Sequence, residues 1–570
     1  MDQYPAGGSL KLASFDSLKA ATRGDDSNLD LGFPFHGHRP AHARAVNSLL
    51  PPSVYRCRPE DESDANDENN DSETSSTSST SSTSSVGVHA AEMMTLMAAG
   101  AVNDRSPSLP LVLSTLNQLM YCLLASETSR EMSEGYADTL DRLRNALRMM
   151  RRFGPVTCGR LEAFAFGSTV CGMHILSSDL DVCIDGEIIK APRNSWRDEH
   201  VGSRLSEVVR FSQQKFLHEL ADLLLRKGDA DERTLERIIH ARVPVFQYVD
   251  QSTGIKCDVI VGGETFRFKA TVLKILADAD WRFAALTRLV KLWAARFGLV
   301  DASMGLLNSY SLKLLVLFHL QNRPVPVLPK LALPRSRGDG LGRGDVHETD
   351  EVDEVDEVEG WDARHRPIRN DLEEGFEHDP KHRRRMYVYV RELSRQLTSP
   401  EGCFHEMIGR NEETLAELFV SFLRFVKDLM ELERMVGDGQ LFQKLKVDTW
   451  HGTFSYGPKD TDRAYHVYVR DPFEEKPDNA ARSLSFAGEY AIHEACDEFC
   501  HRLDRLLHEN KDVEGLEYSS IANVFEAAFG RDARERADER FQSTGTFGLG
   551  AILQTMRKSA ADDCLLLSLE

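Results

Sequence analysis

The sequence predicts an α+β fold, with a catalytic domain of helices and strands followed by a mostly helical domain, in a chain of 570 residues. Three observations predict it. Two segments with helical spacing open the folded part, several short strands follow, and helical spacing returns from about residue 266. A chain of this length can bury two or three cores. Clustered strands flanked by helices indicate an α+β catalytic domain.

Each expected element rests on the spacing of its apolar residues. Helical spacing covers residues 109–125, 136–153 and much of 266–321, and the proline-rich run 324–334 then ends the helix. Short apolar or alternating runs bounded by turn residues predict strands. The last two strands are joined by a turn at residues 251–254. The expected strands are 161–167, 177–186, 242–250 and 255–262.

Composition divides the chain further. Two segments, 59–85 and 345–362, contain eight and ten acidic residues and no basic ones, and such segments cannot bury enough apolar surface to fold. We read the first as part of a solubilising tail and the second as part of an insertion in the helical domain. The expected divisions are a disordered acidic and Ser-rich tail 1–105, a catalytic domain 106–265, a helical domain 266–335, a disordered acidic insertion 336–385, a second part of the helical domain 386–510, and an extension 511–570 without a functional interpretation.

The net charge of −21 conflicts with phosphate binding, but the two acidic segments carry eighteen of the negative charges, which leaves the remainder nearly neutral. No run of 18 to 20 consecutive apolar residues predicts a membrane span, and the first residues lack the apolar core of a secretory signal. The ten cysteines form no CxxC pair, as expected in a reducing compartment. We expect a cytoplasmic protein, also present in the nucleus, with no membrane contact.

One group of residues predicts catalytic chemistry. Asp179 and Asp181 lie two residues apart in a predicted strand, so both project from the same face. Asp258 lies in another predicted strand and can reach the same point. Three carboxylates of this kind can hold two Mg²⁺ ions, or Mn²⁺, for metal-assisted phosphoryl chemistry. Gly167 and Ser168 open a turn after a strand, where backbone N–H groups can approach phosphates.

The run FGSTVCGMHILSSDLDVCI resembles the signature of the DNA polymerase β-like nucleotidyltransferase superfamily. Residues 277–331, the late segment VRDPFEEKPDNAARSLSF and ETLAELFVSFLRFV are similar to terminal uridylyltransferases and cytoplasmic-type poly(A) polymerases, above all to plant RNA uridylyltransferases. The resemblance covers roughly residues 110–505 apart from the insertion. It implies a palm with a mixed sheet, a poly(A)-polymerase-associated helical domain, and addition of uridylates from UTP to RNA 3′ ends.

The resemblance also implies roles for individual residues. Ser168, Lys291 and Ser309 would contact the triphosphate, Thr271 the ribose, and Tyr310 would stack on the base. The late segment would lie near the base edge. Its matching positions are Asp471, Glu474 and Asn479. The implied partners are RNA 3′ ends, NTPs with UTP favoured, and RNA-silencing or decay proteins, for a monomeric enzyme.

The sequence departs from the family in places, and other interpretations stay open. Many relatives carry a second phosphate-binding lysine where this chain has Ala295, so either Arg296 or a different cation of this helix would serve. A poly(A) polymerase using ATP is the alternative within the class, and a catalytically inactive RNA-binding scaffold is the alternative outside it. His493, Cys496 and Cys500 share one face of a predicted helix, but a single helix rarely supplies a closed zinc site.

Overall fold

The computed structural model describes most of the chain between residues 106 and 543. The described residues are 106–127, 130–153, 161–185, 199–239, 241, 243–333, 380–437, 443–458, 467–473, 478–511 and 513–543. The expected tail 1–105, the expected insertion up to residue 379 and the last part of the extension lie outside them.

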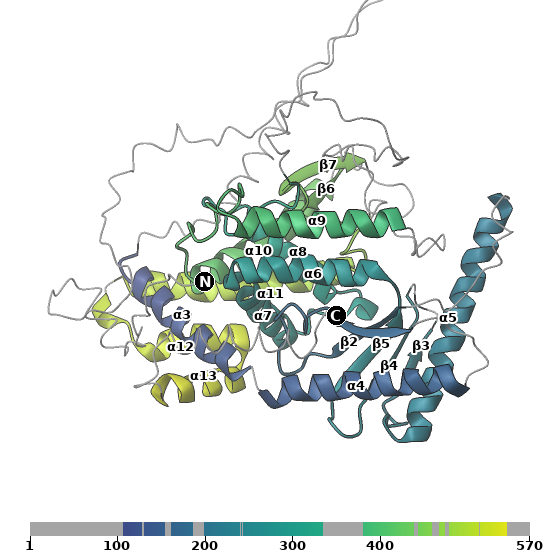
Figure 1. Ribbon diagram of the computed structural model, residues 1–570. Helices are drawn as coiled ribbons and strands as arrows, with labels where there is room; N and C mark the ends of the chain where they lie inside the picture. The colour runs from purple at the N-terminus through teal and green to yellow at the C-terminus, as the bar shows by residue number, and fades with distance from the viewer. Residues whose placement is uncertain are drawn as a thin grey trace, which may run out of the picture.

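A five-stranded mixed sheet forms the palm, in the order β1-β2-β5-β4-β3. The central pair β2 and β5 is parallel, and every other pair is antiparallel. Helices α4 (Arg130–Phe153) and α5 (Glu199–Lys227) pack against the sheet (Figure 1). The strands are β1 (Glu162–Phe166), β2 (Leu180–Asp185), β3 (Glu236–Ile238), β4 (Val245–Val249) and β5 (Lys256–Val261). Apart from β3, the strands and the turn at 251–254 are those that the sequence predicts.

The alternation of side chains explains why these segments pair as a sheet. In β2 and β5, Val182, Ile184 and Val259 are buried and join a core with apolar residues of α4 and α5. The same alternation leaves the aspartates of these strands on the other side of the backbone from that core. Burial of one face therefore fixes the register, because a shift by one residue would bury the carboxylates in apolar surroundings.

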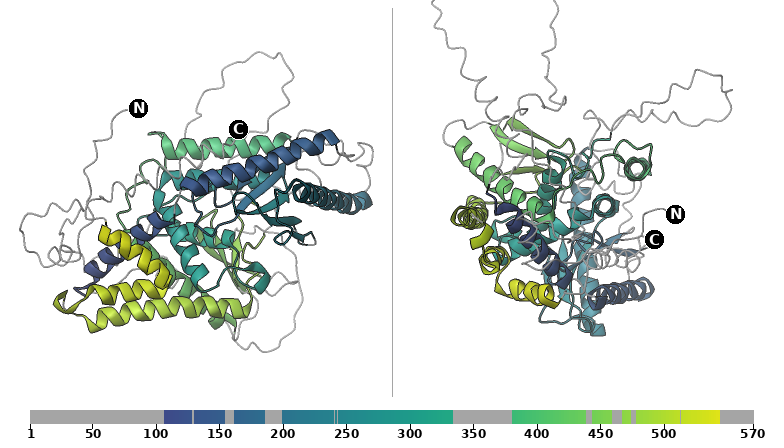
Figure 2. Two further views of the ribbon diagram at one scale, coloured as in Figure 1. Left: turned by 90° about the horizontal axis from the view of Figure 1, so that it is seen from below. Right: turned by 90° about the vertical axis from the view of Figure 1, so that its left-hand side faces the viewer.

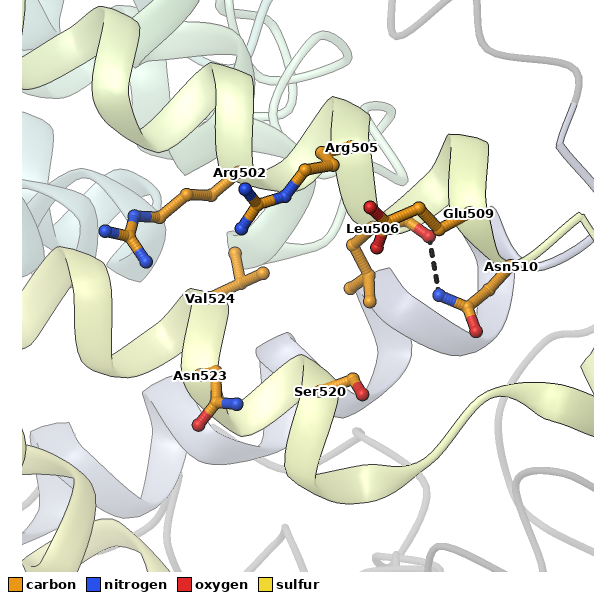
Figure 3. A pocket seen from close by; sticks show the side chains of 8 residues that line it. All are labelled: Arg502, Arg505, Leu506, Glu509, Asn510, Ser520, Asn523 and Val524. Atoms are coloured by element: carbon orange, nitrogen blue, oxygen red, sulfur yellow. Dashed lines mark hydrogen bonds between the residues drawn. The ribbon is translucent and has the colours of Figure 1, made fainter.

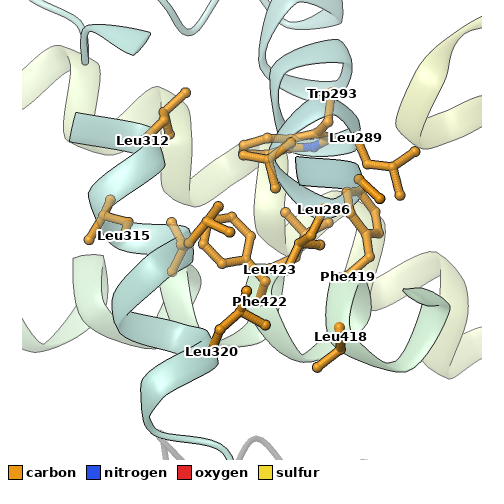
Figure 4. Packing of buried hydrophobic residues seen from close by; sticks show 14 of the residues in the cluster. Leu286, Leu289, Trp293, Leu312, Leu315, Leu320, Leu418, Phe419, Phe422 and Leu423 are labelled. Atoms are coloured by element: carbon orange, nitrogen blue, oxygen red, sulfur yellow. The ribbon is translucent and has the colours of Figure 1, made fainter. Parts of the chain in front are cut away.

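The larger domain is helical and has its own core. Figure 4 shows Leu286, Leu289 and Trp293 of α7 packed with apolar residues of α8 and α10. Helix α8 is apolar on most faces, as the sequence predicts, and residues 311–321 are all buried. The helices are α6 (Glu264–Ala279), α7 (Trp281–Arg296), α8 (Ser309–Gln321), α9 (Pro380–Thr398), α10 (Leu415–Gly437), α11 (Phe486–Glu509), α12 (Tyr518–Phe529) and α13 (Arg531–Ser543), with short 3-10 turns at Ala302–Met304 and Val513–Gly515.

Two features of this domain differ from the sequence-based expectation. The stretch 386–510, expected to be helical, contains a three-stranded sheet in the order β7-β6-β8. Its strands are short and carry several polar residues, so they give little periodic signal. The strands are β6 (Gln443–Asp448), β7 (Thr453–Pro458) and β8 (Tyr468–Arg470).

Helix α3 (Leu109–Ser126) is the second difference. We expected it in the catalytic domain, but it packs against α10, α12 and α13 of the helical domain, as Figure 2 also shows. By length and composition it could cross a membrane, yet 83% of its apolar window is buried inside the protein. A helix that is apolar on most faces needs neighbours all round. The C-terminal helices supply them, which gives the start of the extension 511–570 a structural role.

A buried ion pair ties α7 to the segment before α10. Arg282 pairs with Asp280 at 2.7 Å and donates to the Asn411 side chain at 2.8 Å, and both members of the pair are almost fully buried. We expect Arg282→Met to lower the free energy of unfolding by about 3–5 kcal/mol, because the Asp280 charge would stay buried without its partner. Urea denaturation measures the change.

The matched control is Arg410→Met, whose pair with Glu406 is exposed on both sides. Its removal should change the free energy of unfolding by less than about 0.5 kcal/mol. Equal effects of the two substitutions would contradict the structural importance of the Arg282 pair.

Candidate active site

The three aspartates meet where β2 and β5 run side by side. In the parallel register, Asp181 of β2 lies directly opposite Asp258 of β5. Asp179 stands one residue before β2 begins and, two positions from Asp181, lies on the same face of the extended chain. The sheet therefore brings together the carboxylates that the sequence singled out.

Each carboxylate has a different environment. Gln247 of β4 donates to Oδ2 of Asp258 at 2.7 Å, whereas Oδ1 of Asp258 is buried without a hydrogen-bond partner. Burial raises the pKa of Asp181 to about 6 and also raises the pKa of Asp258. Asp179 pairs with Lys256 at 2.8 Å. The result is a pair of partly buried carboxylates with raised pKa values.

The donor set fits a divalent cation. Carboxylate oxygens are the ligands that Mg²⁺ and Mn²⁺ take, and the orphaned Oδ1 of Asp258 is a free acceptor beside Asp181. Within the described ranges, however, no three acidic, histidine or cysteine side chains already form a group that could hold a metal ion. Asp179 pairs with the ammonium of Lys256 and would have to release it in order to bind a metal ion together with Asp181 and Asp258.

The turn after β1 is shaped around Asp181. Gly167 has a φ of +76°, and a Cβ at this position would lie 2.2 Å from Oδ2 of Asp181. Only glycine leaves room for this close approach. Ser168 follows in the same turn, is 6% exposed, and accepts a backbone hydrogen bond from Met173 at 2.9 Å. Gly167 and Ser168 thus lie beside the carboxylates.

The loop that precedes Asp179 is held by elements from distant parts of the sequence. Tyr136 of α4 donates to the carbonyl oxygen of Ser178 at 2.9 Å. Glu127, at the end of α3, accepts from the backbone N–H of Leu176 at 3.1 Å and pairs with Arg536 of α13 at 2.8 Å. The position of the first aspartate therefore depends on both the palm and the C-terminal helices.

Lys291 of α7 reaches this loop as well. Its ammonium donates to the Ser178 hydroxyl at 2.9 Å and to the carbonyl oxygen of Met173 at 3.3 Å. Burial lowers the pKa of Lys291 to about 7, and nearby Lys313 acts in the same direction. The predicted phosphate-binding lysine thus lies inside the site, although its hydrogen bonds are with the loop itself. Arg296, in contrast, packs against Gly530 at the start of α13.

A second group of predicted residues gathers at the start of α8. The helix begins at Ser309, and the Tyr310 hydroxyl donates to Oδ1 of Asp471 at 3.0 Å. Lys269 of α6 donates to Oδ2 of the same carboxylate at 2.8 Å, and its ammonium lies 5.4 Å from the centre of the Tyr310 ring. The sequence analysis missed Lys269, because a single lysine in an amphipathic helix gives no signal.

The structure does not present every predicted residue to a nucleotide. We expected Asn479 at the base edge, but it is 2% exposed and its side chain bonds only backbone groups, of Val467, Val469 and Ala481. Its amide therefore holds the loop together. Thr271 donates to the carbonyl oxygen of Arg267 within its own helix, at 2.8 Å. Glu474 lies outside the described residues.

Two other features of the helical domain could suggest a ligand site: the cysteines of α11 and a surface pocket. Cys496 and Cys500 are buried in the core between α10 and α11, where they serve as apolar residues. A surface pocket lies between α11 and α12, and Arg502, Arg505 and Asn523 are among the residues that line it (Figure 3). No predicted site residue lines this pocket.

A mixed sheet with two carboxylates in register on neighbouring parallel strands, and a Gly-Ser turn beside them, defines a nucleotidyltransferase palm. Residues 117–266 match the family model described as poly(A) RNA polymerase, mitochondrial-like, central palm domain. Over these residues the palm of this chain is similar to that nucleotidyltransferase family.

Several known proteins are similar to the chain. Protein HESO1 of Arabidopsis thaliana is 26% identical over 378 residues, which cover 66% of this chain and 60% of that protein. Poly(A) RNA polymerase GLD2-B of Xenopus laevis is 29% identical over 168 residues, 30% of each chain. The human mitochondrial poly(A) RNA polymerase is 29% identical over 195 residues, 31% of this chain and 33% of that protein. The chain thus spans 60% or less of the length of these relatives.

Two solved structures have a lower similarity. A crystal structure of the Cid1 poly(U) polymerase is 20% identical, with a TM-score of 0.41 and coverage of 68% of this chain and 93% of that chain. A structure of mtPAP in complex with UTP is 18% identical, with a TM-score of 0.46 and coverage of 72% of both chains.

The close contact at Gly167 allows a direct test of the carboxylate site. We expect Gly167→Ala to weaken Mn²⁺ binding by about 10–100-fold, because the added methyl group displaces the Asp181 carboxylate. Electron paramagnetic resonance of free Mn²⁺ measures the affinity. Gly254→Ala is the matched control, since Gly254 has a φ of +71° but open space around its Cβ. It should lose stability through backbone strain and keep its Mn²⁺ affinity. Unchanged affinity in Gly167→Ala would refute this assignment.

Proposed function

We propose that the protein transfers nucleoside monophosphates from an NTP to the 3′ end of RNA without a template, and that UTP is its preferred substrate. The observation that carries the proposal is the in-register pair of Asp181 and Asp258 beside the Gly167 turn. Similarity of the palm to the poly(A) RNA polymerase family supports RNA as the acceptor.

Asp179, Asp181 and Asp258 would hold the divalent cations. When bound, a pair of such cations would activate the attacking hydroxyl group and stabilise the leaving pyrophosphate. In the reaction the RNA 3′-oxygen forms a bond to the α-phosphorus, the bond from this phosphorus to the bridging oxygen breaks, and the hydroxyl proton is released. No residue of the chain becomes covalently modified.

The remaining residues would bind and orient the nucleotide. Backbone N–H groups of the Gly167–Ser168 turn and the ammonium of Lys291 would meet the phosphates. Ser309 would donate to a phosphate oxygen from the first turn of α8. Tyr310 would offer its ring to the base, with Asp471 holding its hydroxyl group. Thr271 stays our candidate for the ribose, and Glu474 for the base edge.

Uridylate addition is favoured by the similarity of residues 308–321 and of the late segment to plant RNA uridylyltransferases. HESO1 of Arabidopsis thaliana, which matches most of the chain, is a plant protein as well. The poly(A) RNA polymerases among the relatives favour ATP as the second candidate substrate. We further propose a monomeric enzyme of the cytoplasm and nucleus that acts with RNA-silencing or decay proteins.

The nucleotide preference can be measured with purified protein, a short RNA oligonucleotide and each of the four NTPs in the presence of Mg²⁺. We expect extension of the RNA with UTP at a higher kcat/KM than with ATP, CTP or GTP. A higher kcat/KM with ATP would establish the poly(A) polymerase alternative. No extension with any NTP would favour the inactive scaffold.

The role of the carboxylates can be tested with Asp258→Asn. We expect kcat for RNA extension to fall by about a thousandfold, because the amide keeps the shape of the side chain but not its charge on the metal ions. The control is Asp222→Asn. Asp222 of α5 is exposed and pairs with Arg237 of β3, so its replacement should leave kcat unchanged. Extension by Asp258→Asn at the wild-type rate would show that the site assignment is wrong.

A further inference from the structure

Helix α8 carries a largely buried lysine, Lys313, whose ammonium makes no hydrogen bond or ion pair with the described residues. Four lysine and arginine residues are buried in the described part of the chain: Arg282, Arg288, Lys313 and Arg323. Arg282 and Arg323 pair with carboxylates, and Arg288 donates to the carbonyl oxygen of Leu124. Lys313 is only 5% exposed, yet among the described residues nothing accepts a hydrogen bond from it and no carboxylate forms an ion pair with it.

The position of Lys313 on the helix points to the active site. Lys313 follows Ser309 by four residues, so the two side chains share one face of α8. Leu312 and Leu315 face the core with α7 and α10 (Figure 4). Core residues surround Lys313 along the helix, since Val316 and Leu317, three and four residues further on, are fully buried. What distinguishes the position of Lys313 is that it lies one turn after Ser309, a residue of the predicted nucleotide site.

Electrostatic effects on the neighbours agree with this position. The charge of Lys313 lowers the pKa of Asp181, against the larger opposing effect of burial, and it lowers the pKa of Lys291. Lys313 thus lies close enough to act on a carboxylate of β2 and on the cation of α7. Lys256 is engaged by Asp179, and Lys291 by Ser178 and Met173. Of these three cations around the carboxylates, Lys313 is the one without an acceptor.

The side chain of Lys313 is almost wholly buried, and its ammonium Nζ, which is not among the fully buried polar atoms without a partner, keeps some access to solvent. A poorly hydrated cation of this kind favours an anion beside it. The triphosphate of a nucleotide would bring several negative charges and many acceptor oxygens into this site. We propose that Lys313 is a second cation for the triphosphate, acting from α8 together with Lys291 of α7. This inference rests on the proposed function and deepens it, because it names a residue that binds the phosphates of the substrate.

Binding measurements on the full chain test the proposal. UTP, and uridine as a ligand without phosphates, are titrated in Mg²⁺ into wild type, Lys313→Met and Lys313→Arg. We expect Lys313→Met to weaken UTP binding about tenfold or more, because a charge-assisted hydrogen bond is lost, while uridine binding stays unchanged. Lys313→Arg keeps the charge and should recover part of the affinity. The Tm of Lys313→Met without ligand should stay close to that of wild type, because removal of a poorly hydrated charge is offset by the loss of its attraction to Asp181.

The matched control is Lys274→Met on α6, a partly buried lysine that pairs with Asp278. It should bind UTP as wild type does. Two results would overturn the proposal: UTP affinity of Lys313→Met equal to that of wild type, or a lowered Tm with equal weakening of UTP and uridine, which would mean a purely structural role. If UTP binding depends on Lys313 but the wild-type protein extends no RNA, the proposed function is wrong and the phosphate-binding role of Lys313 is kept.

Discussion

The active site depends on the parallel pairing of β2 and β5. Their register sets Asp181 directly opposite Asp258, although two adjacent carboxylates repel each other. The apolar residues on the other face of the same strands, such as Val182 and Val259, bury fully and fix that register. Hydrophobic burial on one side of the sheet thus stabilises an unfavourable concentration of charge on the other. Burial raises the pKa of both aspartates, and neighbouring carboxylates act in the same direction.

The rest of the molecule reduces this conflict by surrounding the carboxylates with cations and fixed hydrogen bonds. Lys256 comes from the palm itself, Lys291 and Lys313 come from the helical domain, and Gln247 donates to Asp258. The loop before Asp179 is fixed by Tyr136 of the palm and by Glu127 at the junction with α13. Palm and helical domain therefore share one site, and neither would position it alone.

Strand alternation and motif spacing were sufficient to predict β1, β2, β4 and β5, the helical segment that contains α6 to α8, and the approach of Asp181 to Asp258. The same local patterns could not place α3, because an apolar helix shows no preference for one domain over another. They missed Lys269, because its contacts with Asp471 and Tyr310 join α6, α8 and the loop after β8, which are distant in sequence. They misjudged Asn479, whose side-chain amide bonds the backbone of Val467, Val469 and Ala481 around β8. The sequence did not predict a role for Lys313 either, because the spacing of residues in an apolar helix does not show which groups a single lysine will face.

The late segment illustrates how tertiary contacts change the meaning of a sequence motif. Asp471 matches a position near the base edge, where a free carboxylate could accept a hydrogen bond from a base nitrogen. In the structure its two oxygens already accept from the Tyr310 hydroxyl, the Lys269 ammonium and the N–H of Phe473, and the residue is 5% exposed. A carboxylate engaged in this way has little capacity left for a base. Asp471 therefore acts through Tyr310, whose ring it orients. The polar group next to that ring is the Lys269 ammonium, a donor rather than an acceptor.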